Sequence, residues 1–144
     1  MVTLNGNLLT INEAFSGLSA PAAAAHIHCC ASIGVNAAVA VPFNGFPGAT
    51  SGTYSQTVDL SLLATYGASF VTANGGTAAS AETAFLAGLN AGQTYANIHD
   101  SNFPGGEIRG QLLVTPEPST AGFLLLGLVP LIAKARNKAR NRGV

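Results

Sequence analysis

Turn-forming residues interrupt the first 114 residues so often that only short strands and helices fit between them. Asn5-Gly6 is a dipeptide typical of two-residue β-hairpin turns, here of type I′, and residues 43–48 and 100–106 concentrate Gly, Pro, Asn and Asp. Between the turns, several runs rich in Val, Ile, Thr and Tyr alternate apolar and polar residues. This punctuation favours short antiparallel strands over a helical bundle or a coiled coil.

These patterns predict a mainly β domain, an antiparallel β-sandwich with two short connecting helices. We expect strands over residues 2–15 as a hairpin, and over 24–30, 53–58, 94–98 and 107–114, with a long loop or two short strands over 34–52. One helix is expected over residues 60–66, capped by Asp59 and closed by Gly67. The other is expected over residues 81–89, with Ser80 as its N-cap and Glu82 in its first turn.

The charge of the chain is unevenly distributed. The formal net charge is zero, but five of the six basic residues lie at the C-terminal end: Lys134, Arg136, Lys138, Arg140 and Arg142. Residues 1–115 hold five acidic residues against Arg109 alone, so this part of the chain is acidic. Nucleic-acid binding needs a basic surface, and we therefore expect no nucleic-acid partner.

The sequence changes character after Val114, which predicts a domain over residues 1–114 and a tail over 115–144. The tail begins with Pro116, Glu117 and Pro118, and continues with an apolar stretch over residues 121–133, for which we expect a hydrophobic helix. Its large apolar residues form a predicted membrane anchor: Phe123, Leu124, Leu125, Leu126, Leu128, Val129, Leu131 and Ile132. A span needs about twenty residues, so the flanking Lys134 and Arg136 would have to snorkel and the basic end over 134–142 would stay cytoplasmic. The alternative is an amphipathic or buried terminal helix with a solvated basic end.

The order of these three parts resembles the PEP-CTERM sorting signal of Gram-negative bacteria that make extracellular polysaccharide. The resemblance implies processing at Pro116-Glu117-Pro118 by an exosortase-type enzyme, membrane contact through residues 121–133 in transit across the inner membrane, and delivery to the cell surface or extracellular matrix. The first residues show no basic segment followed by an apolar one. Because proteins with such a sorting signal have a signal peptide, we expect one upstream of the sequence given, together with a first strand of the domain.

A second resemblance concerns the domain itself. Ala25-His26-Ile27-His28, after Phe15-Ser16-Gly17-Leu18, and Tyr95-Ala96-Asn97-Ile98-His99, before Pro104-Gly105-Gly106-Glu107-Ile108-Arg109-Gly110-Gln111-Leu112, are similar to two segments of CHRD (chordin-type) domains. The resemblance implies a β-sandwich, immunoglobulin-like or superoxide-dismutase-like, in an extracellular protein. The weak charge and the many small polar residues of the domain favour a non-enzymatic binding or structural role, with extracellular polysaccharide or matrix proteins as partners.

All three histidines lie in these two segments. Because side chains alternate along a strand, His26 and His28 share one face with Cys30, and His99 ends another strand. If the two strands pair, three imidazoles meet in a set that suits Cu or Zn, and the arrangement is similar to the His-x-His strand of copper-zinc superoxide dismutase. The alternative function is therefore a metal-binding or redox domain built on His26, His28 and His99. In a purely structural role, these histidines would instead bond to the backbone or to Asp100 and Glu107.

Three interpretations stay open for the adjacent Cys29 and Cys30: a thiolate ligand from Cys30, a vicinal disulfide, and burial as small apolar groups. In the last strand, Ile108, Leu112 and Val114 are expected on the core face with Gly110. Glu107 and Arg109 then share the opposite face with Gln111 and are predicted to form an ion pair. No serine, histidine and carboxylate show a spacing that points to hydrolase chemistry, so no enzyme activity is predicted.

Overall fold

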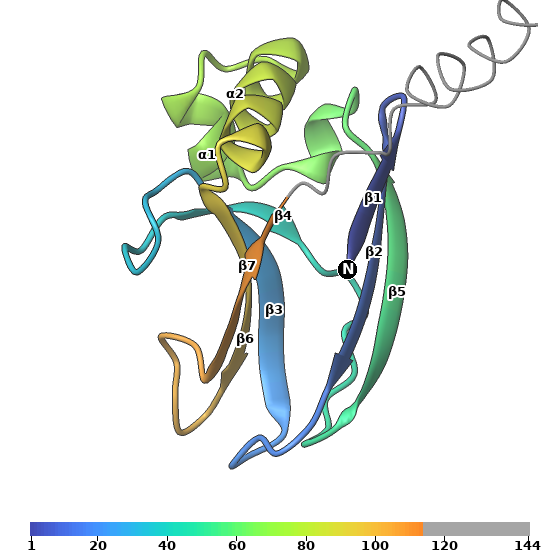
Figure 1. Cartoon of the computed structure of the whole chain (residues 1–144), viewed down its shortest axis with the longest axis vertical. Coiled ribbons are helices and arrows are strands. Elements are labelled where there is room, and N and C mark those ends of the chain that lie inside the picture. Colours follow the sequence, from blue (N-terminus) through green and yellow to red (C-terminus); the bar gives the residue numbers. More distant parts are fainter. Residues whose placement is uncertain (114–144) are drawn as a thin grey trace, which may run out of the picture. The chain divides into compact units, whose positions relative to one another are not determined.

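The computed structural model describes residues 1–113, and these residues form two antiparallel β-sheets with helices at one end (Figure 1). One sheet has the strand order β1-β2-β5 and the other has the order β4-β3-β6-β7. The strands are β1 (Val2–Asn5), β2 (Leu8–Phe15), β3 (Ala22–Cys29), β4 (Ala38–Pro42), β5 (Gly52–Asp59), β6 (Thr94–Asp100) and β7 (Ile108–Leu112). The predicted mainly β, antiparallel architecture with two short helices is confirmed.

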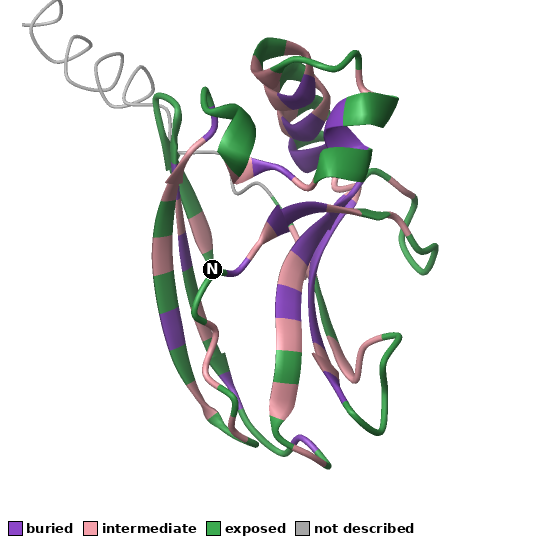
Figure 2. Cartoon of the chain, turned by 180° about the vertical axis from the view of Figure 1, so that it is seen from behind, coloured by how far each residue is buried: buried purple, intermediate pink, exposed green. Residues whose placement is uncertain are grey.

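The core lies between the two sheets and follows the alternation of the sequence. Leu9 and Ile11 of β2 pack with Ile27 of β3 and Ile98 of β6, and all four are almost fully buried. Buried and more exposed residues alternate along several strands (Figure 2). Ile108 and Leu112, predicted on the core face of the last strand, pack against this core. Val114 lies outside the described residues.

The turn between β1 and β2 lies one residue later than predicted. Asn5 pairs with Leu8, so the two central turn residues are Gly6 and Asn7. Gly6 has a φ of +57°, and no residue other than glycine has a positive φ in residues 1–113. A type I′ turn needs positive φ at both central positions, whereas type II′ needs it only at the first. The glycine therefore takes the first position, and the type I′ assignment was wrong.

The first predicted helix, over residues 60–66, is mostly absent. A single 3₁₀ turn spans Leu63–Thr65, and the Asp59 carboxylate accepts bonds from the Ser61 backbone N–H (2.9 Å) and hydroxyl (2.6 Å). Gly67 does not close a helix but precedes α1 (Ala68–Ala73) as its N-cap. A Cβ at Gly67 would lie 2.6 Å from the carbonyl oxygen of Val39, so the glycine permits close approach to β4.

The second predicted helix is present but begins earlier. It is α2 (Ala78–Asn90), and its N-cap is Thr77, whose side chain accepts a bond from the backbone N–H of Ser80. The Ser80 side chain bonds back to the Thr77 backbone, so the expected cap residue serves as the third helical residue of a capping box. Glu82 consequently lies outside the first turn. Both helices contact the end of the four-stranded sheet, α1 through β4 and α2 through β3 and β6 (Figure 1).

The predictions for the tail fall outside the described residues. They concern the motif over 116–118, the apolar helix over 121–133 and the basic end over 134–142. Within residues 1–113, no helix is long and apolar enough to cross a membrane.

Candidate metal centre

The pairing of β3 with β6 brings the three histidines to one face of the four-stranded sheet. The register places Ala24 opposite His99, His26 opposite Asn97 and His28 opposite Tyr95. The intervening Ile27 and Ile98 point into the core, so period two puts the histidines on the outer face, away from β1, β2 and β5. The juxtaposition expected from the sequence is therefore present.

The three imidazoles are close neighbours. Ring centroids lie 5.7 Å apart for His26 and His28, 5.1 Å for His26 and His99, and 5.8 Å for His28 and His99. One nitrogen from each ring can be chosen so that all three lie within 4.8 Å of one another. Nitrogens bound to one metal at 2.0–2.1 Å lie about 3.3–3.6 Å apart in tetrahedral or trigonal geometry. The three nitrogens thus lie within about 1.5 Å of the spacing that a bound ion needs.

Two loops fix the orientation of two of these rings. The loop between β3 and β4 provides the carbonyl oxygen of Ala37, 2.9 Å from Nδ1 of His28. The loop between β6 and β7 provides the carbonyl oxygen of Pro104, 2.9 Å from Nδ1 of His99. Both loops project on the side of the four-stranded sheet away from the other sheet (Figure 1). A carbonyl only accepts, so each Nδ1 carries a proton and each Nε2 of the neutral ring keeps its lone pair.

Each of the three rings has one buried nitrogen without a hydrogen-bond partner in the part of the chain that the structure describes. His26 Nδ1, His28 Nε2 and His99 Nε2 are buried and make no hydrogen bond within the described residues. Buried polar atoms are almost always hydrogen-bonded, so three orphaned nitrogens in one cluster call for an explanation. A metal ligand with its other nitrogen held by a carbonyl is the common arrangement in metal sites, and His28 and His99 both have it. The residues present thus fit a metal ion.

The cluster favours neutral imidazoles, the form that binds metals. Burial, together with the neighbouring His99 and His28, lowers the pKa of His26 to about 4. Burial also lowers the pKa of His28, outweighing the opposite effect of its bond to Ala37. At neutral pH both rings are therefore uncharged, and no proton has to be displaced before a metal binds.

Tyr95 was not among the predicted site residues, yet it supports His28. The two rings are stacked, with centroids 4.8 Å apart and planes 4° apart, and Tyr95 is only 1% exposed. The Tyr95 hydroxyl accepts a bond from the backbone N–H of Ala37 (3.0 Å), the residue whose carbonyl holds His28. Tyr95 lies four residues before His99 on the same strand, so the period of two places both side chains on one face, and this pattern could have identified Tyr95 from the sequence.

The predicted ion pair between Glu107 and Arg109 does not form, because each side chain has other partners. The Arg109 guanidinium lies 3.4 Å from the centroid of the Tyr95 ring and donates to Asn36 Oδ1 (3.2 Å) and the Val35 carbonyl (2.7 Å). The Glu107 carboxylate accepts the backbone N–H of Ser19 at 3.1 Å. Both residues thus anchor segments that precede or follow β3, which a spacing of two residues cannot indicate.

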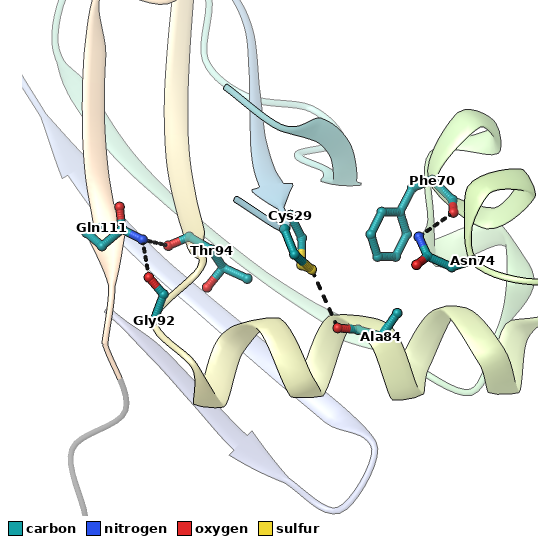
Figure 3. The surroundings of a disulfide bond; sticks show 8 residues. Cys29, Phe70, Asn74, Ala84, Gly92, Thr94 and Gln111 are labelled. Atoms are coloured by element: carbon teal, nitrogen blue, oxygen red, sulfur yellow. Dashed lines mark hydrogen bonds between the residues drawn. A yellow bond between two sulfur atoms is a disulfide. The ribbon is translucent and has the colours of Figure 1, made fainter. Parts of the chain in front are cut away.

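Cys30 does not join the histidines. It forms a vicinal disulfide with Cys29, at the point where β3 ends over α2 (Figure 3). Its Sγ lies 3.5 Å from the carbonyl oxygen of Ala84, and a Cβ at Gly88 would collide with both sulfur atoms. The disulfide thus packs against the helix, and Cys30 has no thiolate to offer a metal. Of the two cysteines, Cys29 is buried and Cys30 is exposed.

The nearby carboxylates also stay apart from the cluster. Asp100 is buried and accepts bonds from Ser19 Oγ, the Ala20 N–H, the Asn102 N–H and the Phe103 N–H, at 3.1, 2.9, 3.0 and 2.6 Å. Neither Asp100 nor Glu107 bonds to a histidine. The structural alternative, with histidines bonded to carboxylates, is therefore not observed, although the bonds of His28 and His99 to the backbone are.

The sequence profile of the CHRD domain matches residues 1–112 of this chain. No curated protein and no solved structure matches it. The matched range contains all three histidines and every strand that the structure describes within residues 1–113.

Proposed function

The chain belongs to the CHRD domain family, and from this premise we propose that it is an exported surface protein whose domain binds one copper or zinc ion through His26, His28 and His99. The observation that carries the proposal is the convergence of three imidazoles, each of which has one buried nitrogen without a hydrogen-bond partner among residues 1–113. Neutral imidazoles are the nitrogen ligands that copper and zinc prefer.

The arrangement around the histidines supports metal binding over a purely structural role. A structural histidine contributes by satisfying both ring nitrogens, whereas each ring here leaves one buried nitrogen unsatisfied at a cost in stability. Two neighbouring strands of the sheet supply the rings, which gives the rigid placement that a metal site needs. A bound ion would pair all three nitrogens at once.

The proposal places this site outside the cell. The succession of Pro116-Glu117-Pro118, the apolar stretch over residues 121–133 and the basic end supports sorting to the surface by an exosortase-type enzyme. Residues 1–115 are acidic and contain few charged residues, which suits contacts with polysaccharide or matrix proteins more than with nucleic acid. In this proposal the domain is a non-enzymatic module of the cell surface or matrix.

Metal analysis of the tag-free full chain tests the central claim. After incubation with Cu or Zn and desalting, we expect about one metal per chain. Because the chain has three histidines and all are in the cluster, His26→Gln, His28→Gln and His99→Gln should each abolish retention. Glu82→Gln, which removes a charge on α2, serves as control and should retain the metal. Absence of stoichiometric metal from the wild-type chain, with its circular dichroism spectrum indicating a folded β protein, would refute the proposal.

The export claim has a separate test. Expression in a PEP-CTERM-sorting bacterium, with a signal peptide fused ahead of residue 1, should yield surface protein that lacks the basic end. Mass spectrometry of the mature C-terminus reads this out. An intact C-terminus at Val144 in the surface form would contradict processing within residues 116–118.

A further inference from the structure

We propose that the ion taken by this site is copper in its monovalent state, in preference to zinc or divalent copper. The inference rests on the proposed function, because it specifies the ion for the cluster of His26, His28 and His99. Three features of the surroundings carry it: the number of ligands, the seclusion of the nitrogens and the charge near the site.

The first feature is the number of ligands. Within residues 1–113, the group that can hold a metal consists of three histidines, with no carboxylate or thiolate among its members. Zinc in proteins is almost always four-coordinate, and its three-histidine sites take a water as the fourth ligand. Divalent copper prefers tetragonal surroundings with four or more ligands. Monovalent copper is stable with three neutral nitrogen ligands in one plane and needs no fourth ligand.

The second feature is the seclusion of the nitrogens. His26 Nδ1, His28 Nε2 and His99 Nε2 are all shielded from solvent, and His28 as a whole is only 7% exposed. The loops that hold His28 and His99 through Ala37 and Pro104 lie over the same face. A fourth ligand would therefore have to be a water brought beside these shielded nitrogens, although His26 and His99 as whole residues are only partly buried. A three-coordinate ion avoids this cost.

The third feature is charge. All three ligands are neutral, so the full charge of the ion stays uncompensated inside the site. The Arg109 guanidinium lies near the site, because it covers the ring of Tyr95 on β6, which stacks on His28. Arg109 reaches Tyr95 from β7 and His28 reaches it from β3, on either side of β6.

The group of potential ligands in the described part of the chain contains no carboxylate. Asp100 and Glu107 bond to Ser19 and to backbone N–H groups, and not to Arg109 or to a histidine. Repulsion from the guanidinium scales with the charge of the ion, so it acts twice as strongly on a divalent as on a monovalent one. Arg109 thus acts as a positioning residue that discriminates against divalent ions.

Competition titrations of the full chain test the inference. Under anaerobic conditions with ascorbate, Cu(I) is partitioned between the protein and the chromogenic chelator bicinchoninate, while Zn(II) is titrated against a zinc-sensitive dye. We expect one Cu(I) per chain, no displacement by a tenfold excess of Zn(II), and an X-ray absorption spectrum with three nitrogens at about 2.0 Å. Arg109→Gln should narrow the preference for Cu(I) over Zn(II) by about tenfold, whereas Arg109→Lys, which keeps the charge, should largely preserve it.

The outcomes separate this inference from the proposed function. A chain that binds Zn(II) or Cu(II) as tightly as Cu(I), or that shows a stoichiometric Cu(II) signal in electron paramagnetic resonance after loading with Cu(I) in air, overturns the inference but leaves the metal site standing. A chain that retains none of the three ions overturns both. An unchanged preference in Arg109→Gln refutes the role given to the guanidinium.

Discussion

The imidazole of His28 lies parallel to the phenol ring of Tyr95, with their planes 4° apart and their centroids separated by 4.8 Å. The two residues are opposite one another on β3 and β6, so the stack follows from the register of the central strand pair. Tyr95 also reaches Ala37, and through it the loop whose carbonyl orients His28. Tyr95 thus controls the position of His28 in the proposed site, although it contributes no atom to the histidine cluster.

Tyr95→Phe should weaken the site without removing the stack. The change leaves the Ala37 N–H without its acceptor, which should lower the free energy of unfolding by about 1 kcal/mol and metal affinity by about tenfold. Urea unfolding and a competition titration measure the two effects. Tyr54→Phe is the matched control. Tyr54 lies on β5 in the other sheet, and its hydroxyl donates to the carbonyl oxygen of Asn44, so its removal should lower the free energy of unfolding without changing metal affinity. Equal metal affinities in the two variants would contradict this role for Tyr95.

Two adjacent glycines in the loop between β6 and β7 should respond differently to alanine. Gly106 has a φ of +107°, and a Cβ there would collide with the side chain of Asn97, whereas a Cβ at Gly105 would meet nothing within 4 Å. Gly106→Ala should lower the free energy of unfolding by about 1–3 kcal/mol and, by moving the Pro104 carbonyl away from His99, weaken metal binding. Gly105→Ala should behave as the wild type in both assays. Similar effects of the two substitutions would show that the loop does not depend on this close approach.

The metal-free domain should lose stability in mild acid through His26. Its pKa in the folded protein is about 4, lowered from 6.5 chiefly by burial, so the unfolded chain takes up the proton first as the pH falls. This contribution is fully present above pH 6.5 and is lost between pH 6.5 and about 4. It amounts to about 1–2 kcal/mol after allowance for solvent screening of a partly exposed ring. Urea unfolding at several pH values should show a shallower profile for His26→Gln; parallel profiles would rule out this origin.

Gly88→Ala should destabilise the domain, although alanine ordinarily improves a helix. The substitution favours α2 by up to about 1 kcal/mol in propensity, but the added Cβ would collide with the sulfur atoms of Cys29 and Cys30. Overpacking of this kind costs about 1–3 kcal/mol, so the net effect on the free energy of unfolding is a decrease. The opposite substitution at the exposed neighbouring position, Ala87→Gly, should also destabilise, by up to about 1 kcal/mol. A more stable Gly88→Ala would show that the disulfide leaves room at the helix.

The sequence predicted the sheets and the histidine face because both depend on short-range periodicity. Alternation along residues 24–30 placed His26 and His28 together, and the segment ending in His99 could be recognised as another strand. The same periodicity correctly placed Ile108 and Leu112 toward the core. Where a side chain's neighbours lie on the same strand or in its mate, local pattern is sufficient.

The errors occur where the decisive contact is distant in sequence. Gly67 was predicted to end a helix, but a glycine is needed there because a side chain would collide with the carbonyl oxygen of Val39 on β4. Arg109 and Glu107 were predicted to form an ion pair, but Arg109 donates to Asn36 and Glu107 accepts from Ser19. The alternation of β3 in the sequence predicts Cys30 on the histidine face. In the structure the strand ends at Cys29, and the disulfide lies against α2. Contacts of this kind depend on how loops return to the sheet, which one sequence does not encode locally.

The placement of the histidines on β3 and β6 has a consequence for folding order. These strands come from opposite ends of the domain's sequence and pair as the two central strands of their sheet. The three nitrogens therefore meet only after a long loop has closed, which is a slow, high-contact-order step. An ion that bound all three nitrogens would stabilise the folded domain, and it could bind tightly only after the two strands had paired.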